Sequence, residues 1–518
     1  MNDIEYTLLI VILFVIAVCM FSITVNTPVI AEEQMYVSAG VLAQSNTMYK
    51  DFAYPQMPYI PLMYAGIYTI TGTEYYLLYA RIFTFLTMFA SVIVMYSIGY
   101  MITKNFAFSI AGVLLYSFSE ITIHSLGHAW NAAPPVVFSL LGVYFFLKVR
   151  FGGGVRPLHV FLAGLFIAVA SGMKLFYAAI LIPFMISTFI FPPDYSFWRK
   201  LQNSFVPLLA GFVTGLLPVL YYYLINQESF LFHNIGFHFI NYEWHGKNMF
   251  AFTGGAVPLY SAAGYIVSHS GWLSILPVLV AFVVGVTVMI FNFKSKRDFY
   301  SEFISNKRYF TVCGVLIAAF LPVLQPWLLW QHYLAFPFPF IILFLYAVYV
   351  VLEDKMRRIF VAAVAVVVLF VVIYAVPAVS DSVQNVSSVK QWTPIQYHNE
   401  ARSITNKIPR SEKIAAFEPL VALEGGRQLY PEFSSGYLMF HVADRFSDAE
   451  REICKTIPLS SFDGWIGDAQ PAAIIIPNGY AFYSVPDAIA GAGYYRKIED
   501  ENDKFNIYLF VSEDEEGK

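Results

Sequence analysis

The sequence predicts a polytopic α-helical membrane protein, with about eleven transmembrane helices and a small outward-facing C-terminal α/β domain. Three observations predict this class. Of the 518 residues, 58% are hydrophobic and only 13% are charged, which is far from the balance of a soluble globular protein. Long apolar stretches recur up to about residue 380, and charged clusters with short apolar segments follow them. Lysine and arginine gather in alternate loops between the stretches.

The apolar stretches can be placed by length, because a helix needs about 20 apolar residues to cross the hydrocarbon core of a bilayer. The first stretch is too long for the apolar part of a signal peptide and lacks a small-residue cleavage site, so we interpret it as a retained signal anchor. The predicted spans centre on residues 6–25, 78–100, 106–122, 132–149, 157–172, 174–191, 204–224, 262–292, 309–326, 333–352 and 358–378.

The positively charged residues predict the orientation of these spans, because cytoplasmic loops carry an excess of lysine and arginine. The loops on one side hold Lys104, Lys148, Arg150, Arg156, Arg199, Lys200, Lys294, Lys296, Arg297, Lys307, Arg308, Lys355, Arg357 and Arg358. The loops on the other side are nearly bare, with Lys50, Arg81, Lys174 and Lys247 as the main exceptions. We therefore expect a cytoplasmic N-terminus, an outward first loop and an outward C-terminal segment. An odd number of spans agrees with this arrangement.

The composition also predicts two domains. Residues 1–380 form the transmembrane module, whose first outer loop is 26–77, and residues 381–518 form the extracytoplasmic α/β domain. In the second domain "KIAAF", "AAIIIP" and "NIYLFVS" are typical of strands, and "PIQYHNEARSITNKI" is typical of an amphipathic helix. The formal net charge of -4 and the absence of basic blocks argue against a nucleic-acid partner. Three distant cysteines predict neither a disulfide framework nor a zinc site.

The first outer loop begins with two adjacent carboxylates, Glu32 and Glu33, shortly after the first span. The segment "EEQMYVSAGVLAQ" has helical spacing, and we expect a helix that lies on the membrane surface. Glu32 and Tyr36 would then share one face, four residues apart. Two interpretations of the carboxylates remain open at this point. They are solvated residues favoured by the dipole at a helix N-terminus, or they are functional groups held at the outer interface.

The next segment, "YKDFAYPQMPYIPLMYAG", combines prolines and aromatic residues with Asp51 and Gln56. The order of an acidic pair, then "Y-x-D-F", then "YPQMPYIPL" resembles the GT-C superfamily of integral membrane glycosyltransferases. The branch with protein O-mannosyltransferases and lipid A aminoarabinose transferases is the most similar. The resemblance extends over the whole chain, from the first-loop acid to the C-terminal α/β domain. It implies transfer of a sugar from a polyprenyl-phosphate donor to an acceptor hydroxyl, with inversion, on the outer face of the cytoplasmic membrane.

The resemblance also implies roles for residues of the first loop. The candidate catalytic base is Glu32 or Glu33, and Glu32 is favoured because Tyr36 follows it at the family's spacing. A positioned carboxylate can take the proton of the attacking hydroxyl. The family usually has aspartate here, so the longer glutamate leaves the alignment uncertain by one residue. The residues expected to contact substrate are Tyr36, Asp51, Tyr54, Gln56, His128 and Asn131.

A lipid phosphate leaving group requires a cation near the outer interface. Lys174, in "ASGMKLFYAAI", lies in an expected outward hairpin and resembles the family's Gly-x-x-x-x-Thr-Lys element, although Met173 replaces the usual hydroxyl residue. Arg81 suits bidentate contact with a phosphate, and His332 resembles the polar residue before the family's "YL-x-x-P". For each, an ordinary interfacial role remains the alternative: a snorkelling lysine, an anchoring arginine and a headgroup-facing histidine.

Other polar groups carry weaker signals. "SEITIHSLGHAWN" holds His124 and His128 four residues apart, a spacing compatible with a divalent cation. No third ligand has a fixed spacing, so we expect no metal site and no certain cofactor. Relatives often carry an acid close to the position of Asn131, so a second carboxylate role is not implied. The outer segment "SFLFHNIGFHFINYEWHGKNMFAF" is either an aromatic belt at the bilayer surface or a sugar-stacking surface.

Two other classes were weighed. A transporter or lipid flippase for a glycolipid would place ionisable residues near the middle of spans, but here they cluster at the outer ends. A role as a receptor or assembly subunit would not explain why Glu32, Lys174 and Arg81 all occur on the outer side. The transferase is therefore favoured, with membrane lipids, a polyprenyl-phosphate sugar donor and a glycan, lipid or protein acceptor as partners. Neither the sugar, hexose or pentose, nor the acceptor can be read from the sequence.

Overall fold

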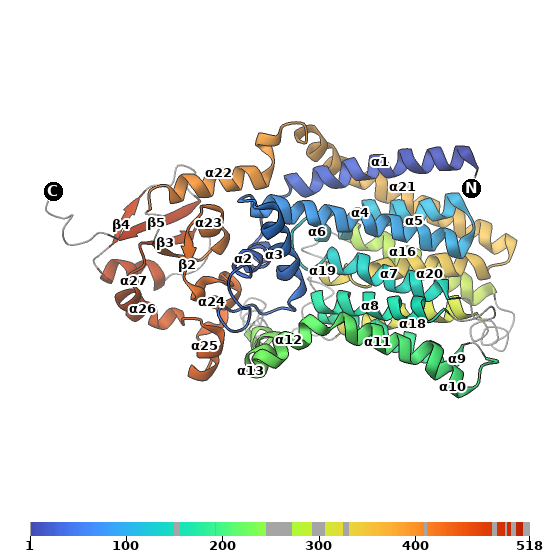
Figure 1. Ribbon diagram of the computed structural model, residues 1–518. Helices are drawn as coiled ribbons and strands as arrows, with labels where there is room; N and C mark the ends of the chain where they lie inside the picture. The colour runs from blue at the N-terminus through green and yellow to red at the C-terminus, as the bar shows by residue number, and fades with distance from the viewer. Residues whose placement is uncertain are drawn as a thin grey trace, which may run out of the picture. The chain divides into compact units, whose positions relative to one another are not determined.

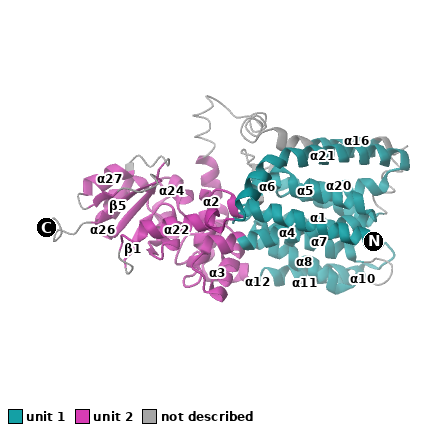
Figure 2. Ribbon diagram, turned by 90° about the horizontal axis from the view of Figure 1, so that it is seen from above, with its two compact units in different colours: residues 1–24, 82–217, 250–387 teal, residues 25–81, 218–249, 388–518 magenta. Residues whose placement is uncertain are grey.

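The computed structural model describes residues 2–149, 156–191, 193–244, 272–292, 306–324, 331–408, 412–478, 484–492, 495–498 and 504–510. The chain divides into two compact units, each built from separated segments (Figure 2). Unit 1 comprises residues 1–24, 82–217 and 250–387, and unit 2 comprises residues 25–81, 218–249 and 388–518. The first outer loop thus belongs to the same compact unit as the C-terminal segment. The composition-based domains 1–380 and 381–518 stay a prediction.

Unit 1 is formed by apolar helices (Figure 1). Each predicted span contains a helix of the structure, and some spans are broken by short 3-10 or π turns. The helices and turns that contribute to unit 1 are α1 (Asp3–Asn26), α4 (Tyr76–Thr103), α5 (Phe106–Phe118), α6 (Glu120–Leu126), α7 (Pro134–Lys148), α8 (Pro157–Met173), η1 (Leu175–Ile180), α9 (Leu181–Ile190), α10 (Phe197–Lys200), η2 (Leu201–Phe205), α11 (Val206–Gly215), α16 (Trp272–Asn292), α18 (Lys307–Phe320), η4 (Leu321–Leu324), α19 (Gln331–Leu334), α20 (Phe338–Val351) and α21 (Asp354–Asn385).

Length and composition identify three described helices that can cross a membrane by themselves, namely α1, α4 and α21. A fourth is counted if the bent stretch from residue 197 to residue 225 is one span. Six shorter apolar helices of 10–17 residues accompany them in the described part of the chain. α21 begins at Asp354, directly after its N-cap Glu353, and its length of 32 residues takes it beyond the predicted span of 358–378.

The C-terminal part of unit 2 is an α/β fold around a sheet of order β2-β1-β3-β5-β4. β1 pairs in parallel with both β2 and β3, whereas β5 pairs antiparallel with β3 and β4. The predicted strands "KIAAF", "AAIIIP" and "NIYLFVS" correspond to β1, β3 and β5, and the predicted amphipathic helix to α22. The elements are α22 (Thr393–Thr405), β1 (Lys413–Ala416), α23 (Pro419–Glu424), β2 (Gln428–Leu429), α24 (Tyr437–Ala443), α25 (Asp448–Cys454), α26 (Phe462–Ala469), β3 (Ala473–Pro477), α27 (Ser484–Ala492), β4 (Tyr495–Ile498) and β5 (Phe505–Phe510).

The first outer loop joins this fold through two helices. α2 (Ala31–Leu42) lies where the sequence predicts a helix, and α3 (Tyr59–Thr71) was not predicted. α2 packs against α3, α23 and α24, and Val41 and Leu42 contact the apolar core of the C-terminal segment. The middle segment of unit 2 contributes α12 (Leu217–Ile225), α13 (Gln227–Leu231) and η3 (Phe232–Gly236). α2 is buried against protein at every position from Glu33 to Gly40, which explains why this helix forms.

Candidate functional site

The two carboxylates of the first outer loop stand in the first turn of α2. The N-cap, Ile30, offers no side-chain hydrogen bond to the free backbone N–H groups of that turn. Acidic residues at this end are stabilising because the N-terminus of a helix carries partial positive charge. The structure gives the two neighbours different surroundings, since Glu33 is fully buried and Glu32 is exposed.

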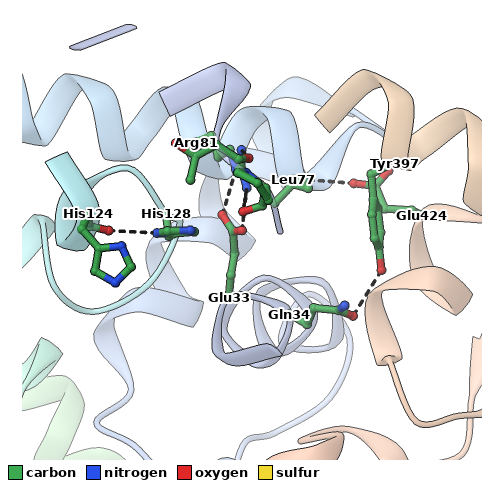
Figure 3. Close-up of polar contacts among 10 residues, drawn as sticks. Glu33, Gln34, Leu77, Arg81, His124, His128, Tyr397 and Glu424 are labelled. Carbon is green, nitrogen blue, oxygen red and sulfur yellow. Dashed lines mark hydrogen bonds and ion pairs between the residues drawn. The ribbon is translucent and has the colours of Figure 1, made fainter. Parts of the chain in front are cut away.

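Glu33 forms a bidentate ion pair with Arg81, and both side chains are fully buried (Figure 3). Nε of Arg81 donates to Oε1 of Glu33 at 2.9 Å, and Nη2 donates to Oε2 at 2.7 Å. The guanidinium also donates to the carbonyl oxygens of Thr27, at 2.5 Å, and Pro28, at 3.3 Å. The pair therefore ties the chain before α2 to the start of α4. The predicted contact of Arg81 with a donor phosphate stays a prediction.

Glu32 has no ion-pair partner among the described residues, and its side chain reaches solvent. Desolvation by the surrounding protein raises the pKa of this carboxyl, and its own backbone N–H opposes part of that rise. The Glu32 carboxylate also affects Tyr437 of α24. Burial makes the larger contribution to the raised pKa of the Tyr437 hydroxyl, and the charge of Glu32 raises this pKa further. A carboxylate with a raised pKa that solvent can reach is suited to accept a proton.

Gln34 connects the next position of α2 to the C-terminal segment of unit 2. Its Nε2 donates to Oε2 of Glu418 at 2.5 Å. The hydroxyl of Tyr397 donates to its Oε1 at 3.2 Å (Figure 3). Glu424 makes a parallel connection, because it accepts from the backbone N–H of Leu77 at 2.7 Å and from His398 at 2.5 Å. Glu418 lies 384 residues from Gln34 along the chain, and Glu424 lies 347 residues from Leu77. No local sequence signal could have identified them.

The loop between α2 and α3 has a specific internal structure. Asp51 accepts a hydrogen bond from the backbone N–H of Thr47 at 2.7 Å, and the hydroxyl of Tyr49 donates to the carbonyl oxygen of Gln56 at 2.6 Å. Tyr54 is fully buried, and its ring packs edge-on against Tyr36 at 6.1 Å between centroids. The four residues expected to bind substrate here, Tyr36, Asp51, Tyr54 and Gln56, thus share one loop and its neighbouring helix. Their contact with substrate stays a prediction.

Unit 1 brings Lys174 and His332 together. Lys174 is the C-cap of α8 and is 9% exposed, and its Nζ lies 5.3 Å from the centroid of the Tyr333 ring. The pKa of the His332 imidazole lies well below its usual range. Burial is the main cause, and the positive charge of Lys174 lowers this pKa further. The ring of His332 packs on Trp130 at 4.9 Å between centroids. A buried ammonium beside aromatic rings is a strong local attraction for an anion.

His128 and Asn131 lie in the stretch between α6 and α7, and both are buried. Nδ1 of His128 lies 3.2 Å from the carbonyl oxygen of His124, and its ring packs against Trp130 at 5.6 Å. This stretch therefore shares Trp130 with His332. No group of three or more His, Cys, Asp or Glu side chains that could hold a metal occurs in the described chain.

The predicted aromatic outer segment is described as far as residue 244, so His245 lies outside the described residues. Burial lowers the pKa of His233 and of His238 to about 4 each, so both imidazoles are neutral. His233 packs against Tyr49, and the adjacent Ser229 donates to the carbonyl oxygen of Tyr49 at 2.5 Å. These two histidines thus pack within unit 2. Trp244 packs on α24 instead, at 4.6 Å from the ring of His441.

The solved structures of similar fold include those of the following two proteins. Crystal structures of ArnT from Cupriavidus metallidurans match at a TM-score of 0.60 when bound to undecaprenyl phosphate and 0.58 in the apo state, with 12% and 11% sequence identity. The matches cover 98% and 97% of this chain and 99% and 98% of ArnT. The oligosaccharyltransferase of Archaeoglobus fulgidus, tethered to an acceptor peptide, matches at a TM-score of 0.51 with 10% identity over 98% of this chain and 74% of that protein. No family model and no curated protein matches the sequence.

Both similar proteins are membrane glycosyltransferases of the GT-C superfamily. At these identities the likeness shows the fold alone, and it extends over nearly the full length of the chain. It confirms the predicted resemblance and the predicted class of polytopic α-helical membrane protein with a C-terminal α/β part.

Proposed function

We propose that this chain, which has the GT-C fold, is a glycosyltransferase that moves a sugar from a polyprenyl-phosphate donor to an acceptor hydroxyl. The observation that carries the proposal is the fold, which matches a protein bound to undecaprenyl phosphate over 98% of this chain. The cytoplasmic membrane is the proposed location, with the reaction on its outer face. The transferred group is a hexosyl or pentosyl residue.

Glu32 is the proposed general base. It is the exposed member of the pair, and its raised pKa makes it a better proton acceptor than an ordinary carboxylate. Glu33 is proposed to position the helix and not to accept the proton. Both of its oxygens accept hydrogen bonds from the buried guanidinium of Arg81, which fixes the position of this carboxylate. Glu33 is therefore a positioning residue that holds the first turn of α2, and Arg81 is held with it.

Lys174 is the proposed ligand of the donor phosphate, with His332 beside it. In the reaction the acceptor hydroxyl gives its proton to Glu32, and its oxygen forms a bond to the anomeric carbon. The bond from that carbon to the phosphate oxygen breaks, and the lipid phosphate leaves with the electron pair. The ammonium of Lys174 neutralises the charge that develops on this oxygen. One displacement of this kind inverts the anomeric centre.

The test is release of free polyprenyl phosphate from a panel of polyprenyl-phosphate sugars. The protein is purified into phospholipid nanodiscs, and a crude membrane extract supplies acceptors. We expect wild type to release lipid phosphate from at least one donor, and Glu32→Gln to lower kcat by about 100-fold or more, as loss of a general base does. Lys174→Ala should weaken donor binding, which is measured separately as the KM for the donor.

Two controls separate catalysis from folding. Glu33→Gln is expected to lose activity in proportion to the loss of folded protein, as measured by size-exclusion chromatography. Trp198→Ala changes an exposed aromatic residue of α10 that no contact above involves, and it should behave as wild type. If wild type releases no lipid phosphate from any donor, or if Glu32→Gln equals wild type, the transferase proposal is wrong. Translocation of the lipid would then be the next activity to assay.

A further inference from the structure

α24 of unit 2 has two different faces. Met439, Phe440 and Val442 are buried, whereas Tyr437 and His441 are half-buried and stand four residues apart on the other face. Their rings stack, with 5.0 Å between centroids and 20° between planes. Residues four apart on a helix are neighbours on its surface. Tyr437 also packs against the apolar core of the C-terminal segment, so the stacked pair of rings lies at the edge of that core.

Hydrogen bonds fix the ring of His441. Its Nδ1 donates to the carbonyl oxygen of Tyr437 at 2.9 Å, and its Nε2 lies 2.7 Å from Oδ1 of Asn241. Both ring nitrogens are therefore engaged by protein, so His441 is suited to act as a rigid surface and not as a proton carrier. Asn241 brings a carboxamide group to the edge of the rings.

Trp244 extends the surface. Its ring meets His441 edge-on, with 4.6 Å between centroids and 68° between planes. It also packs against the apolar cluster that contains Met439, Val442 and Phe446. An aromatic belt would direct such a tryptophan toward lipid, whereas this one is held by α24. Of the two predicted interpretations of this segment, the sugar-stacking surface is therefore favoured for Trp244 over the aromatic belt.

The surface is attached to the α2 region through contacts inside unit 2. α2 packs against α24, and the hydroxyls of Ser434 and Ser435, directly before α24, donate to the carbonyl oxygen of Ala53 at 3.2 and 2.8 Å. Gly436 joins them to the helix with a φ of 53°, and a Cβ there would lie 2.9 Å from the carbonyl oxygen of Phe417. Glu32, in the first turn of α2, is close enough for its charge to act on the hydroxyl of Tyr437.

We propose that Tyr437, His441, Trp244 and Asn241 form a saccharide site that binds the glycosyl acceptor beside Glu32. Flat aromatic rings attract the C–H faces of a sugar ring, and the carboxamide and hydroxyl groups at the edge suit its hydroxyls. The inference rests on the proposed transferase and adds a substrate class to it: the acceptor presents a saccharide. A sugar hydroxyl bound on these rings would lie next to the proposed base.

The experiment uses the full chain in phospholipid nanodiscs, without sugar-headed detergents that would fill the site. The probes are methyl α-D-mannopyranoside, methyl β-D-galactopyranoside and methyl β-D-xylopyranoside, and saturation-transfer NMR detects their ring protons. We expect at least one to bind, and Trp244→Ala to weaken that binding about tenfold, as loss of a central aromatic contact does. Tyr437→Phe keeps the ring and removes only the hydroxyl at its edge, so it should weaken binding less than Trp244→Ala does. Trp198→Ala is the matched control.

The same variants are then assayed for release of polyprenyl phosphate at increasing glycoside concentration. Trp244→Ala should raise the concentration for half-maximal release about tenfold and leave kcat unchanged, as loss of a binding contact does. If wild type releases lipid phosphate but no glycoside binds, or if Trp244→Ala binds as wild type does, the saccharide site is wrong while the transferase stands. If a glycoside binds but wild type releases nothing with any donor, the acceptor role fails together with the transferase.

Discussion

Glu32 and Glu33 are adjacent and chemically identical, yet the structure assigns them opposite environments. The difference follows from their places at the end of α2, because Glu32 is exposed in the first turn and burial begins at Glu33 and continues through Gly40. Position 33 faces the buried start of α4, where Arg81 lies, and position 32 faces solvent. A buried bidentate pair fixes two segments of chain, whereas an exposed carboxylate stays available to a substrate.

The buried pair predicts a difference in stability between two isosteric variants. Glu33→Gln leaves the guanidinium of Arg81 buried without its counter-charge, and we expect the free energy of unfolding to fall by about 3–5 kcal/mol. Glu32→Gln removes an exposed charge and should change it by about 0.5 kcal/mol or less. Thermal unfolding in nanodiscs, followed by tryptophan fluorescence, measures both. The double variant Glu33→Leu/Arg81→Met should recover part of the loss. Equal melting of the two single variants would contradict the assignment.

The raised pKa of Glu32 predicts the acid side of the pH profile. A general base works only when ionised, so activity should be present above its pKa and lost as the pH falls through it. Because desolvation raises this pKa, the midpoint of the acid limb of kcat/KM should lie above 4.5. Initial rates of lipid phosphate release between pH 4 and pH 8 measure it. Glu32→Asp should keep an acid limb at lower activity. A midpoint at or below 4.5 would argue against Glu32 as the base.

Glycines allow two helices of unit 1, α8 and α11, to approach closely. A Cβ on Gly164 would lie 2.1 Å from the carbonyl oxygen of Leu208, and a Cβ on Gly211 would lie 2.0 Å from that of Phe161. Small residues at such positions let the backbones of membrane helices pack directly against each other. The contact is reciprocal, since each glycine faces the backbone of the other helix.

Replacing one of these glycines should separate the helices. We expect Gly164→Ala to lower the free energy of unfolding by about 1–3 kcal/mol, because the added methyl group has no room. The control is Gly66→Ala in α3, where a Cβ would meet nothing within 4 Å and alanine favours the helix by up to about 1 kcal/mol. Thermal unfolding of both variants tests the contrast. If Gly164→Ala melts at the wild-type temperature, the close packing of α8 and α11 is not required.

The sequence predicted the elements better than their connections. Hydropathy located the helices of unit 1 because the bilayer requires long apolar runs, and short apolar stretches between charged clusters located β1, β3 and β5. α3 was missed because its prolines and tyrosines, in "YIPLMY", are typical of a loop. The pairs Glu33–Arg81 and Gln34–Glu418 join residues 48 and 384 positions apart. Such contacts depend on tertiary packing, which a single sequence does not encode locally.

The candidate site was predictable in part for the same reason. The residue types and their order around Glu32 and Lys174 could be read from the chain. The distinction between Glu32 and Glu33 could not, since it depends on where along α2 the burial against protein begins. The ring surface of Tyr437, His441 and Trp244 combines two segments of unit 2 that are separated by nearly 200 residues. Only an aromatic-rich outer segment signalled it in advance.

The orientation of the chain in the membrane is a further prediction from charge. The loop with Arg199 and Lys200 is expected in the cytoplasm, and the C-terminal α/β fold is expected outside. Single cysteines at two exposed acidic positions can test this, one at Asp194 and one at Asp463. The background needs the native Cys19, Cys313 and Cys454 replaced by alanine. Cys454 is buried, so folding of the background must be verified first.

In intact cells a membrane-impermeant maleimide that crosses only the outer envelope should label Asp463→Cys and spare Asp194→Cys. After permeabilisation both should be labelled, which shows that each thiol is accessible. The proposed donor chemistry requires this result, because Glu32 belongs to the same compact unit as the C-terminal fold. Labelling of Asp194→Cys alone in intact cells would place unit 2 in the cytoplasm. The base would then face soluble nucleotide sugars, and a lipid-linked donor would lose its chemical rationale.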